Sequence, residues 1–128
     1  MCWCGKLGCV ETFLAGPALE RAWCDLGGPV LPVADNIVEL AHQDGGAETL
    51  LQRYENRLAR ALATVINLLD PETIVLGGGL SKIDRLYENV PKLWREFVFS
   101  DEVGTTLRRA KHGDASGVRG AAWLWPTN

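Results

Sequence analysis

The stretch Asp-Pro-Glu-Thr-Ile-Val-Leu-Gly-Gly-Gly-Leu-Ser at residues 70–81 decides the fold of this chain. Its β-branched residues predict a short buried strand over residues 72–76. The strand runs straight into Gly77, Gly78 and Gly79. Three glycines permit a tight turn into a helix, and they also permit close approach of the backbone to a nucleotide. The stretch therefore indicates an α/β fold, with a plain turn or a nucleotide contact at the end of the strand.

A long amphipathic helix is predicted upstream, over residues 46–69. Its apolar face comprises Ala47, Leu50, Leu51, Tyr54, Leu58, Ala61, Leu62, Val65, Ile66 and Leu69. Its polar face comprises Arg53, Glu55, Asn56, Arg57 and Arg60. We expect the helix to end before Asp70-Pro71, because proline disfavours helical geometry in the residue that precedes it.

Weaker patterns fill the rest of the chain. They predict helices over residues 11–25, 35–42, 81–97 and 117–125, and a second strand over residues 105–110. Gly16-Pro17 and Pro91 are expected to interrupt two of these helices. Strand, helix and strand in this order predict parallel pairing through a right-handed crossover. Because two parallel strands make a poor independent sheet, we expect the chain to be part of a larger α/β domain.

Three thiols lie close together near the N-terminus: Cys2, Cys4 and Cys9, with Gly5 and Gly8 between them. They can converge on one tetrahedral metal ion, because glycine lets the backbone fold back without a side-chain clash. Spacings of two and five residues favour metal ligands over disulfides in a reducing compartment. We therefore expect a zinc ion here, with a fourth ligand from outside the cluster; the alternative is free or incidentally oxidised thiols.

Composition indicates one globular domain of 128 residues, 47% hydrophobic and 23% charged, with a formal net charge of −3. A mildly acidic chain without a basic stripe argues against a nucleic-acid partner. No apolar run reaches the roughly 20 residues that span a bilayer, and no signal peptide is recognisable, so a cytoplasmic protein without a membrane partner is expected.

Cys24 and the five tryptophans are expected to be packing residues. Asp35 or Asn36, and Asp114 or Ser116, are expected helix caps.

Two motifs together carry a family resemblance. Cys-Trp-Cys-Gly-Lys-Leu-Gly-Cys-Val-Glu at residues 2–11, followed by the glycine motif at residues 70–81, resembles the ROK family of sugar kinases and repressors. The segment 111–126 is similar to the C-terminus of bacterial fructokinases in that family. The resemblance implies that residues 1–128 are the helix-rich C-terminal part of a ROK kinase domain. Such a domain has an actin/hexokinase-like, ribonuclease H-like α/β fold.

The resemblance also implies roles for single residues. Cys2, Cys4 and Cys9 would be ligands of a structural zinc ion, whose usual histidine precedes this segment in the family. Water, a neighbouring chain, His42 or His112 would then complete the site, or the N-terminal end would fray and lose the metal. Glu11 would accept hydrogen bonds from sugar hydroxyls, whereas from its position alone it is a carboxylate that favours a helix N-terminus. The Gly77–Gly79 turn would hold ATP at its adenosine side. No catalytic residue is assigned, because the family's catalytic aspartate and phosphate loops also precede this segment.

The first functional hypothesis is the C-terminal segment of an ATP- and magnesium-dependent, fructokinase-like kinase. The intact family would phosphorylate the 6-hydroxyl of a hexose such as fructose, and this chain alone would be inactive. We also expect a homo-oligomer, because a sheet edge and the apolar face of the 46–69 helix would lack their usual cover. One alternative is a noncatalytic zinc-binding or oligomerising module. Another is the sugar-sensing part of a ROK repressor, which is weaker because no helix-turn-helix precedes the zinc motif.

Overall fold

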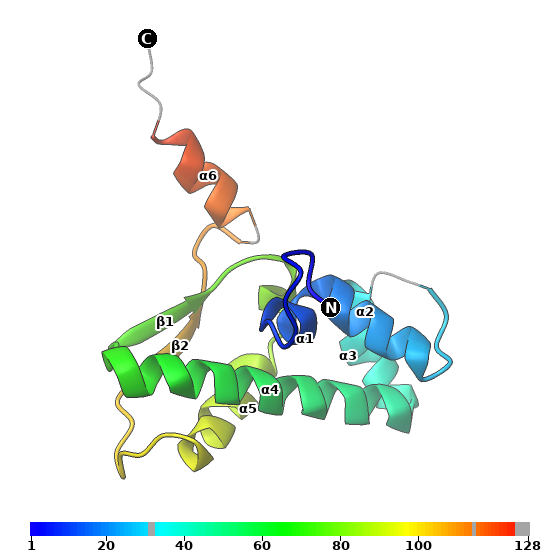
Figure 1. The fold of residues 1–128 in the computed structure, drawn as a ribbon, viewed down its shortest axis with the longest axis horizontal. Coiled ribbons are helices and arrows are strands. Elements are labelled where there is room, and N and C mark those ends of the chain that lie inside the picture. Colours follow the sequence, from blue (N-terminus) through cyan, green and yellow to red (C-terminus); the bar gives the residue numbers. More distant parts are fainter. Residues whose placement is uncertain (31–32, 114, 125–128) are drawn as a thin grey trace.

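The computed structural model describes residues 1–30, 33–113 and 115–124, with the backbone alone for residues 33–35. Within these ranges the helices are α1 (Glu11–Leu14), α2 (Gly16–Asp25), α3 (Val33–Gln43), α4 (Gly45–Leu69), α5 (Leu86–Leu93) and α6 (Ser116–Ala122). Short 3-10 helices η1 (Gly79–Lys82) and η2 (Trp94–Glu96) flank α5. Strands β1 (Thr73–Leu76) and β2 (Thr106–Arg109) form a small sheet at one end of α4 (Figure 1).

Helix α4 confirms the prediction for residues 46–69, and its two ends have identifiable causes. Asp44 caps its start, since Oδ1 accepts hydrogen bonds from the backbone N–H groups of Gly46 (2.7 Å) and Ala47 (3.0 Å). Asp70 ends it in the left-handed region, with φ of 44°, directly before Pro71. Neither α4 nor any other helix in the described part of the chain is long and apolar enough to cross a membrane.

The buried face of α4 differs from the predicted one. Ala59 and Ala63 are buried, whereas Val65 and Leu69, predicted to be on the core side, are exposed. Glu55, predicted to be on the polar face, is only 2% exposed. The covered stripe follows the neighbouring elements rather than hydrophobicity alone. Small alanines permit close helix contact, and Glu55 is tolerated inside because a cation reaches it.

Helix α5 corrects the prediction of a helix over residues 81–97 broken at Pro91. The segment Gly79–Lys82 is a 3-10 helix, and α5 begins only at Leu86. Leu86, Val90 and Trp94 recur at every fourth position and are buried. Their burial keeps Pro91 inside the helix. Proline removes just one backbone donor there, and the α-helix ends two residues later.

The two strands are parallel, as predicted, with Thr73 opposite Thr106 and Ile74 opposite Leu107. Ile74, Leu76 and Leu107 join the core, together with buried residues of α2 to α5. Alternation along a strand places the remaining side chains on the other face. These are Thr73, Val75, Thr106 and Arg108, all exposed. One face of the sheet is therefore packed and the other is uncovered in this chain. Strand β1 is only half-buried, so the prediction of a buried strand over residues 72–76 is wrong in that respect.

The two ends of the chain confirm some expectations and correct others. The break between α1 and α2 lies at Ala15, next to the predicted Gly16-Pro17. Helix α3 already begins at Val33, so the expected caps Asp35 and Asn36 lie inside it. Ser116 does not cap α6, because its hydroxyl donates to the Gly113 carbonyl (2.6 Å). The other expected cap, Asp114, lies outside the described residues. The helix predicted over residues 117–125 is shorter than expected, since α6 ends at Ala122.

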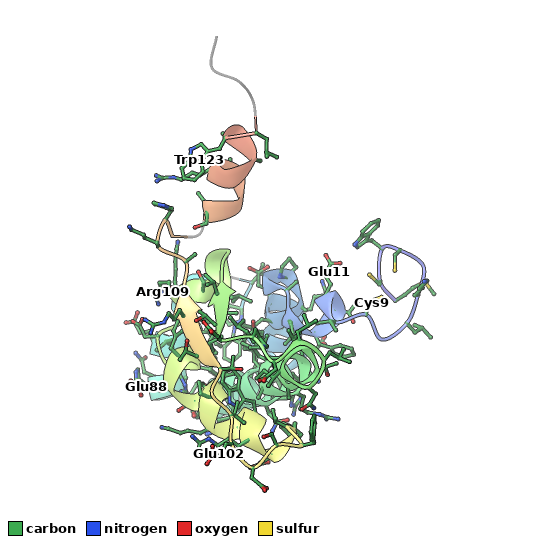
Figure 2. The ribbon with its side chains drawn as sticks, turned by 90° about the vertical axis from the view of Figure 1, so that its left-hand side faces the viewer. Cys9, Glu11, Glu88, Glu102, Arg109 and Trp123 are labelled. Atoms are coloured by element: carbon green, nitrogen blue, oxygen red, sulfur yellow. The ribbon has the colours of Figure 1, made fainter. Side chains whose placement is uncertain are left out.

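Several residues expected in the interior are at the surface. Trp23 and Trp94 are buried, but Trp3 is 86% exposed and Trp123 is also exposed. Cys24 is exposed as well, so it does not pack as a small hydrophobe. Trp123 follows α6, a short helix that stands away from the body of the molecule in both views (Figures 1 and 2).

A cluster of charged side chains joins α4 to α5. The Arg85 guanidinium binds Glu48 (Nη1 to Oε2, 2.7 Å) and Glu55 (Nε to Oε1, 2.6 Å). Asn89 donates a further hydrogen bond to Glu55 (3.1 Å). Hydrogen bonding to Arg85 lowers the pKa of Glu48. A lowered folded-state pKa contributes stability above the ordinary value of about 4.5, and that contribution is lost as the pH falls further.

We predict that Arg85→Ala destabilises the chain by about 2 kcal/mol, because it leaves the buried Glu55 without its cation while the quarter-exposed Arg85 site lets water partly compensate. Urea denaturation followed by circular dichroism measures the change. Arg53→Ala, at an exposed position of the same helix, is the control and is expected to cost under about 0.5 kcal/mol. Equal stability of the two variants would contradict the prediction.

Candidate functional site

The N-terminal loop is folded by its glycines. Gly5 and Gly8 have φ values of 78° and 76°, in the region that side chains disfavour. The Cys2 N–H donates to the Lys6 carbonyl and the Gly5 N–H to the Cys2 carbonyl, both at 2.9 Å. Figure 2 shows this loop projecting from the body, with Cys9 where it returns towards α1. The turn brings three separated cysteines to one place.

The thiols of Cys2, Cys4 and Cys9 form a group able to hold a metal ion, with sulfur atoms all within 4.8 Å of one another. Cys4 Sγ and Cys9 Sγ lie 3.5 Å apart. Two thiolates at about 2.3 Å from one tetrahedral zinc ion would be about 3.8 Å apart, so the spacing fits zinc. A hydrogen bond to the Lys6 backbone lowers the pKa of the Cys4 thiol, and contact with Cys4 raises the pKa of Cys9.

Neither candidate histidine joins this group in the described part of the chain. His42 lies in the last turn of α3. His112 packs edge-on against Trp123, with ring centroids 6.3 Å apart. The fourth ligand that a structural zinc site requires is therefore not supplied by either histidine in this arrangement.

Glu11 opens α1 directly beside the thiol loop. Its Oε2 accepts a hydrogen bond from Trp3 Nε1 (2.9 Å), and the Cys2 thiol points at the same oxygen (3.9 Å). Together these residues line a depression of about 550 Å³, to which Arg21 also contributes. A carboxylate held by the Trp3 indole N–H at the wall of a depression can accept hydrogen bonds from ligand hydroxyls.

The glycine turn lines a second depression, of about 490 Å³. Gly78 has φ of 80° and ψ of 176°, a conformation that is essentially restricted to glycine. A Cβ atom at Gly77, Gly78 or Gly79 would meet no other heavy atom within 4 Å. The backbone of the turn is therefore open to this depression. A flat ligand such as a nucleoside could approach it closely.

The two depressions adjoin at the corner between α1 and α2, because Ala15 and Pro17 line both of them. Tyr54 of α4 fixes this corner, since its hydroxyl donates to the Leu14 carbonyl (3.2 Å). Burial raises the pKa of Tyr54 to about 12, so the hydroxyl keeps its proton and remains a donor at neutral pH. The structure thus places the Glu11 carboxylate and the glycine turn in neighbouring depressions.

Comparison with known proteins assigns the family. The sequence profile of the ROK family matches residues 1–128. The chain belongs to the ROK family. An N-acetyl-D-glucosamine kinase of Mannheimia succiniciproducens is 37% identical over 126 residues, which are 98% of this chain and 41% of that kinase. The chain therefore spans about two fifths of the length of such curated ROK relatives.

Solved ROK structures share the fold. The ROK hexokinase from Thermus thermophilus matches with a TM-score of 0.76 and 33% identity, over 94% of this chain and 41% of that one. A ROK family transcriptional regulator, a homologue of the E. coli MLC protein, matches with a TM-score of 0.67 and 27% identity, over 84% of this chain and 30% of that one. These likenesses confirm the expected helix-rich α/β fold of an actin/hexokinase-like domain.

The sequence indicated Cys2, Glu11 and Gly77–Gly79 among the residues that line the two depressions, but it missed the side chains that support them. Trp3 lies inside the cysteine motif, yet no pattern indicated that its indole would hold Glu11. Tyr54 was recognised only as an apolar position of the long helix. For both residues the signal was absent, because each bond joins segments whose proximity appears only in the folded chain.

We predict that Gly78→Ala destabilises the fold by about 1 to 3 kcal/mol, because its backbone conformation is strained for any residue with a Cβ atom. Gly79→Ala is the matched control. It has no positive φ and open space around the new methyl group, so it should be neutral or slightly stabilising. The midpoints of urea denaturation of the two variants test this prediction. Similar midpoints would contradict strain at Gly78.

Proposed function

We propose that residues 1–128 are the part of an ATP-dependent ROK sugar kinase domain that contacts both substrates. Glu11 of the zinc motif, residues 2–11, binds hydroxyls of the sugar. Gly77, Gly78 and Gly79 of the glycine motif, residues 70–81, face the adenosine side of the nucleotide. The observation that carries the proposal is the junction of the two depressions at Ala15 and Pro17.

The chemistry of phosphoryl transfer explains why this junction matters. A kinase must hold the attacking hydroxyl and the γ-phosphoryl group in line, and catalysis depends on position and charge stabilisation. Neighbouring depressions for sugar and nucleotide satisfy the positional requirement. The Asp-x-Gly-Gly-Thr motif of the family, which provides phosphate contacts, does not occur in residues 1–128. We therefore propose that this chain positions substrates, and that magnesium and the catalytic base act from the family's preceding lobe.

The proposed substrate is a hexose phosphorylated at its 6-hydroxyl. The name of the Mannheimia relative supports N-acetyl-D-glucosamine, and that of the Thermus relative supports a hexose in general. Fructose as a substrate is supported only by the similarity of segment 111–126 to fructokinases. N-acetylglucosamine, glucose and fructose should therefore be compared in the same assay, because one carboxylate at the wall of a depression does not select among hexoses.

A sugar-sensing role in a repressor is the second candidate, favoured by the likeness to the ROK transcriptional regulator. Such a protein would bind the sugar through Glu11 without transferring a phosphoryl group. A noncatalytic zinc or oligomerisation module would need neither sugar nor nucleotide. Phosphorylation of a sugar would distinguish the kinase from the sensor and the noncatalytic module. Sugar binding without phosphorylation would distinguish the sensor from the module.

We predict that the chain alone does not phosphorylate N-acetylglucosamine, glucose or fructose with ATP and magnesium. A hybrid in which this chain replaces the matching two fifths of the Mannheimia kinase should phosphorylate at least one of them. Glu11→Gln in the hybrid should lower kcat/KM for the sugar by about tenfold or more, because an amide accepts hydroxyl hydrogen bonds less strongly than a carboxylate does.

Glu39→Gln in the same hybrid is the control, since Glu39 is an exposed carboxylate of α3. A hybrid that folds and binds sugar without turnover would favour the sensor. Turnover that is equal in the Glu11→Gln and Glu39→Gln hybrids would overturn the role given to Glu11.

We also propose that the Cys2, Cys4 and Cys9 thiolates bind zinc. Metal analysis after gentle purification is expected to find up to one zinc ion per chain, and Cys4→Ser should abolish it, because two ligands with an incomplete shell hold zinc weakly. Cys24→Ser, at the cysteine outside the cluster, should leave the zinc content unchanged. Equal zinc in wild type and Cys4→Ser would sink the assignment.

Self-association is proposed as well. Exposed apolar residues support it: Val65, Leu68 and Leu69 on α4, Val75 on the uncovered sheet face, and Phe99. Uncovered apolar surface favours association, and a symmetric dimer is the commonest closed arrangement. Light scattering at micromolar concentration should therefore give about twice the monomer mass, and a compact monomer would contradict this.

A further inference from the structure

Two of the three clustered thiols are set apart by their environment. Cys4 is exposed and Cys9 is partly exposed, with their sulfur atoms 3.5 Å apart. Cys2 is buried, at 7% exposure, and its thiol points at the Glu11 carboxylate. A solvent-borne oxidant can therefore reach Cys4 and find Cys9 beside it, whereas Cys2 is shielded.

We propose that Cys4 and Cys9 are a reversible oxidation site, at which a hydroperoxide such as hydrogen peroxide forms an intramolecular disulfide. The metal and sugar roles proposed above do not require this modification. It adds a second covalent state of the same loop.

The loop can accommodate the new bond. A disulfide brings its sulfur atoms to about 2.05 Å, so Cys4 and Cys9 must approach by about 1.5 Å. Gly5 and Gly8 lie between them, and the space around both glycines is open to 4 Å. Lys6 and Leu7, which complete the connection, are exposed. A segment with two glycines and no packed side chain between the cysteines can shift by this distance without disturbing the core.

The chemistry balances with one equivalent of peroxide. The Cys4 thiolate attacks one peroxide oxygen, the O–O bond breaks, and Cys4 becomes a sulfenic acid while hydroxide leaves and takes up a proton as water. The Cys9 thiolate then attacks the Cys4 sulfur and displaces the sulfenic oxygen as a second water. Two thiols lose two electrons, and one hydrogen peroxide gains them. A dithiol reverses the step by thiol–disulfide exchange.

Oxidation would also remove metal ligands. A disulfide sulfur is a poor zinc ligand, because zinc binds the thiolate. Of the clustered thiols only Cys2 would remain, so a bound zinc ion would be released. The Cys2 and Trp3 contacts to Glu11 do not involve the oxidised pair. The oxidised loop would thus lose its metal while its carboxylate remains held by the indole.

Peptide mass spectrometry tests the proposal directly in the whole chain. Trypsin cleaves after Lys6 and after Arg21, between the two cysteines and beyond them. After stoichiometric hydrogen peroxide and alkylation of the remaining thiols, peptides 1–6 and 7–21 should be joined by a disulfide. Fragmentation should place it at Cys4 and the alkyl group at Cys2. Dithiothreitol should separate the peptides again.

Cysteine variants test whether the disulfide joins Cys4 and Cys9 and distinguish it from oxidation of other cysteines. Cys4→Ser and Cys9→Ser should lose the joined pair, whereas Cys2→Ser and Cys24→Ser should keep it. Chain loaded with zinc should release one zinc ion for each disulfide formed. The mass readout does not need the metal, so it also decides the metal-free case.

The proposal is overturned if peroxide leaves Cys4 and Cys9 reduced, if the bond joins Cys2 instead, or if Cys24 cross-links chains while the loop stays unchanged. Irreversible sulfinic acid at Cys4 without the joined peptides would also overturn it, because it would show that Cys9 does not reach the sulfenic acid.

Discussion

Burial of one stripe of α4 organises this molecule, because α1, α2, α3, α5 and η2 all pack against it. Short helices of three to eleven residues are marginal on their own in water, so they depend on such a partner. Leu51 on α4, Ile37 on α3 and Val90 on α5 are almost completely enclosed where these helices meet. Each of the shorter helices gains its stability by covering part of the same long surface.

The candidate site depends on this helix in a second way. Tyr54 emerges from the buried stripe and holds the Leu14 carbonyl, and the corner between α1 and α2 separates the two depressions. Glu11 lies at the start of α1, less than one helical turn before that carbonyl. The carboxylate proposed to bind a sugar is therefore placed by the same element that supports the glycine turn's depression.

Local sequence patterns predicted where the helices and strands lie, but not which of their faces would be buried. The spacing of apolar residues was enough for α4, and β-branched residues before three glycines were enough for β1, because both signals are contained in a few neighbouring positions. Glu55 was placed on the wrong face since its partner Arg85 is 30 residues away in the sequence. Pro91 was expected to break a helix that burial of Leu86 and Val90 maintains.

The sequence likewise predicted one part of the candidate site and missed another. The cysteine spacing and its glycines predicted that three sulfur atoms would converge, because the loop that joins them is short. The exposure of Cys24 and Trp3 could not be read from the sequence, since it depends on which surfaces the other helices cover. The contact between Trp3 and Glu11 likewise depends on the direction in which the loop returns to α1.

The Arg85 cluster gives the contact between α4 and α5 a different response to heat from that of the core around it. The hydration of charged groups becomes less favourable on warming, so the penalty for burying Glu55 and partly burying Arg85 and Glu48 shrinks. The stabilisation from apolar surface levels off over the same range. The α4–α5 contact should therefore carry a growing share of the fold's cohesion as the temperature rises.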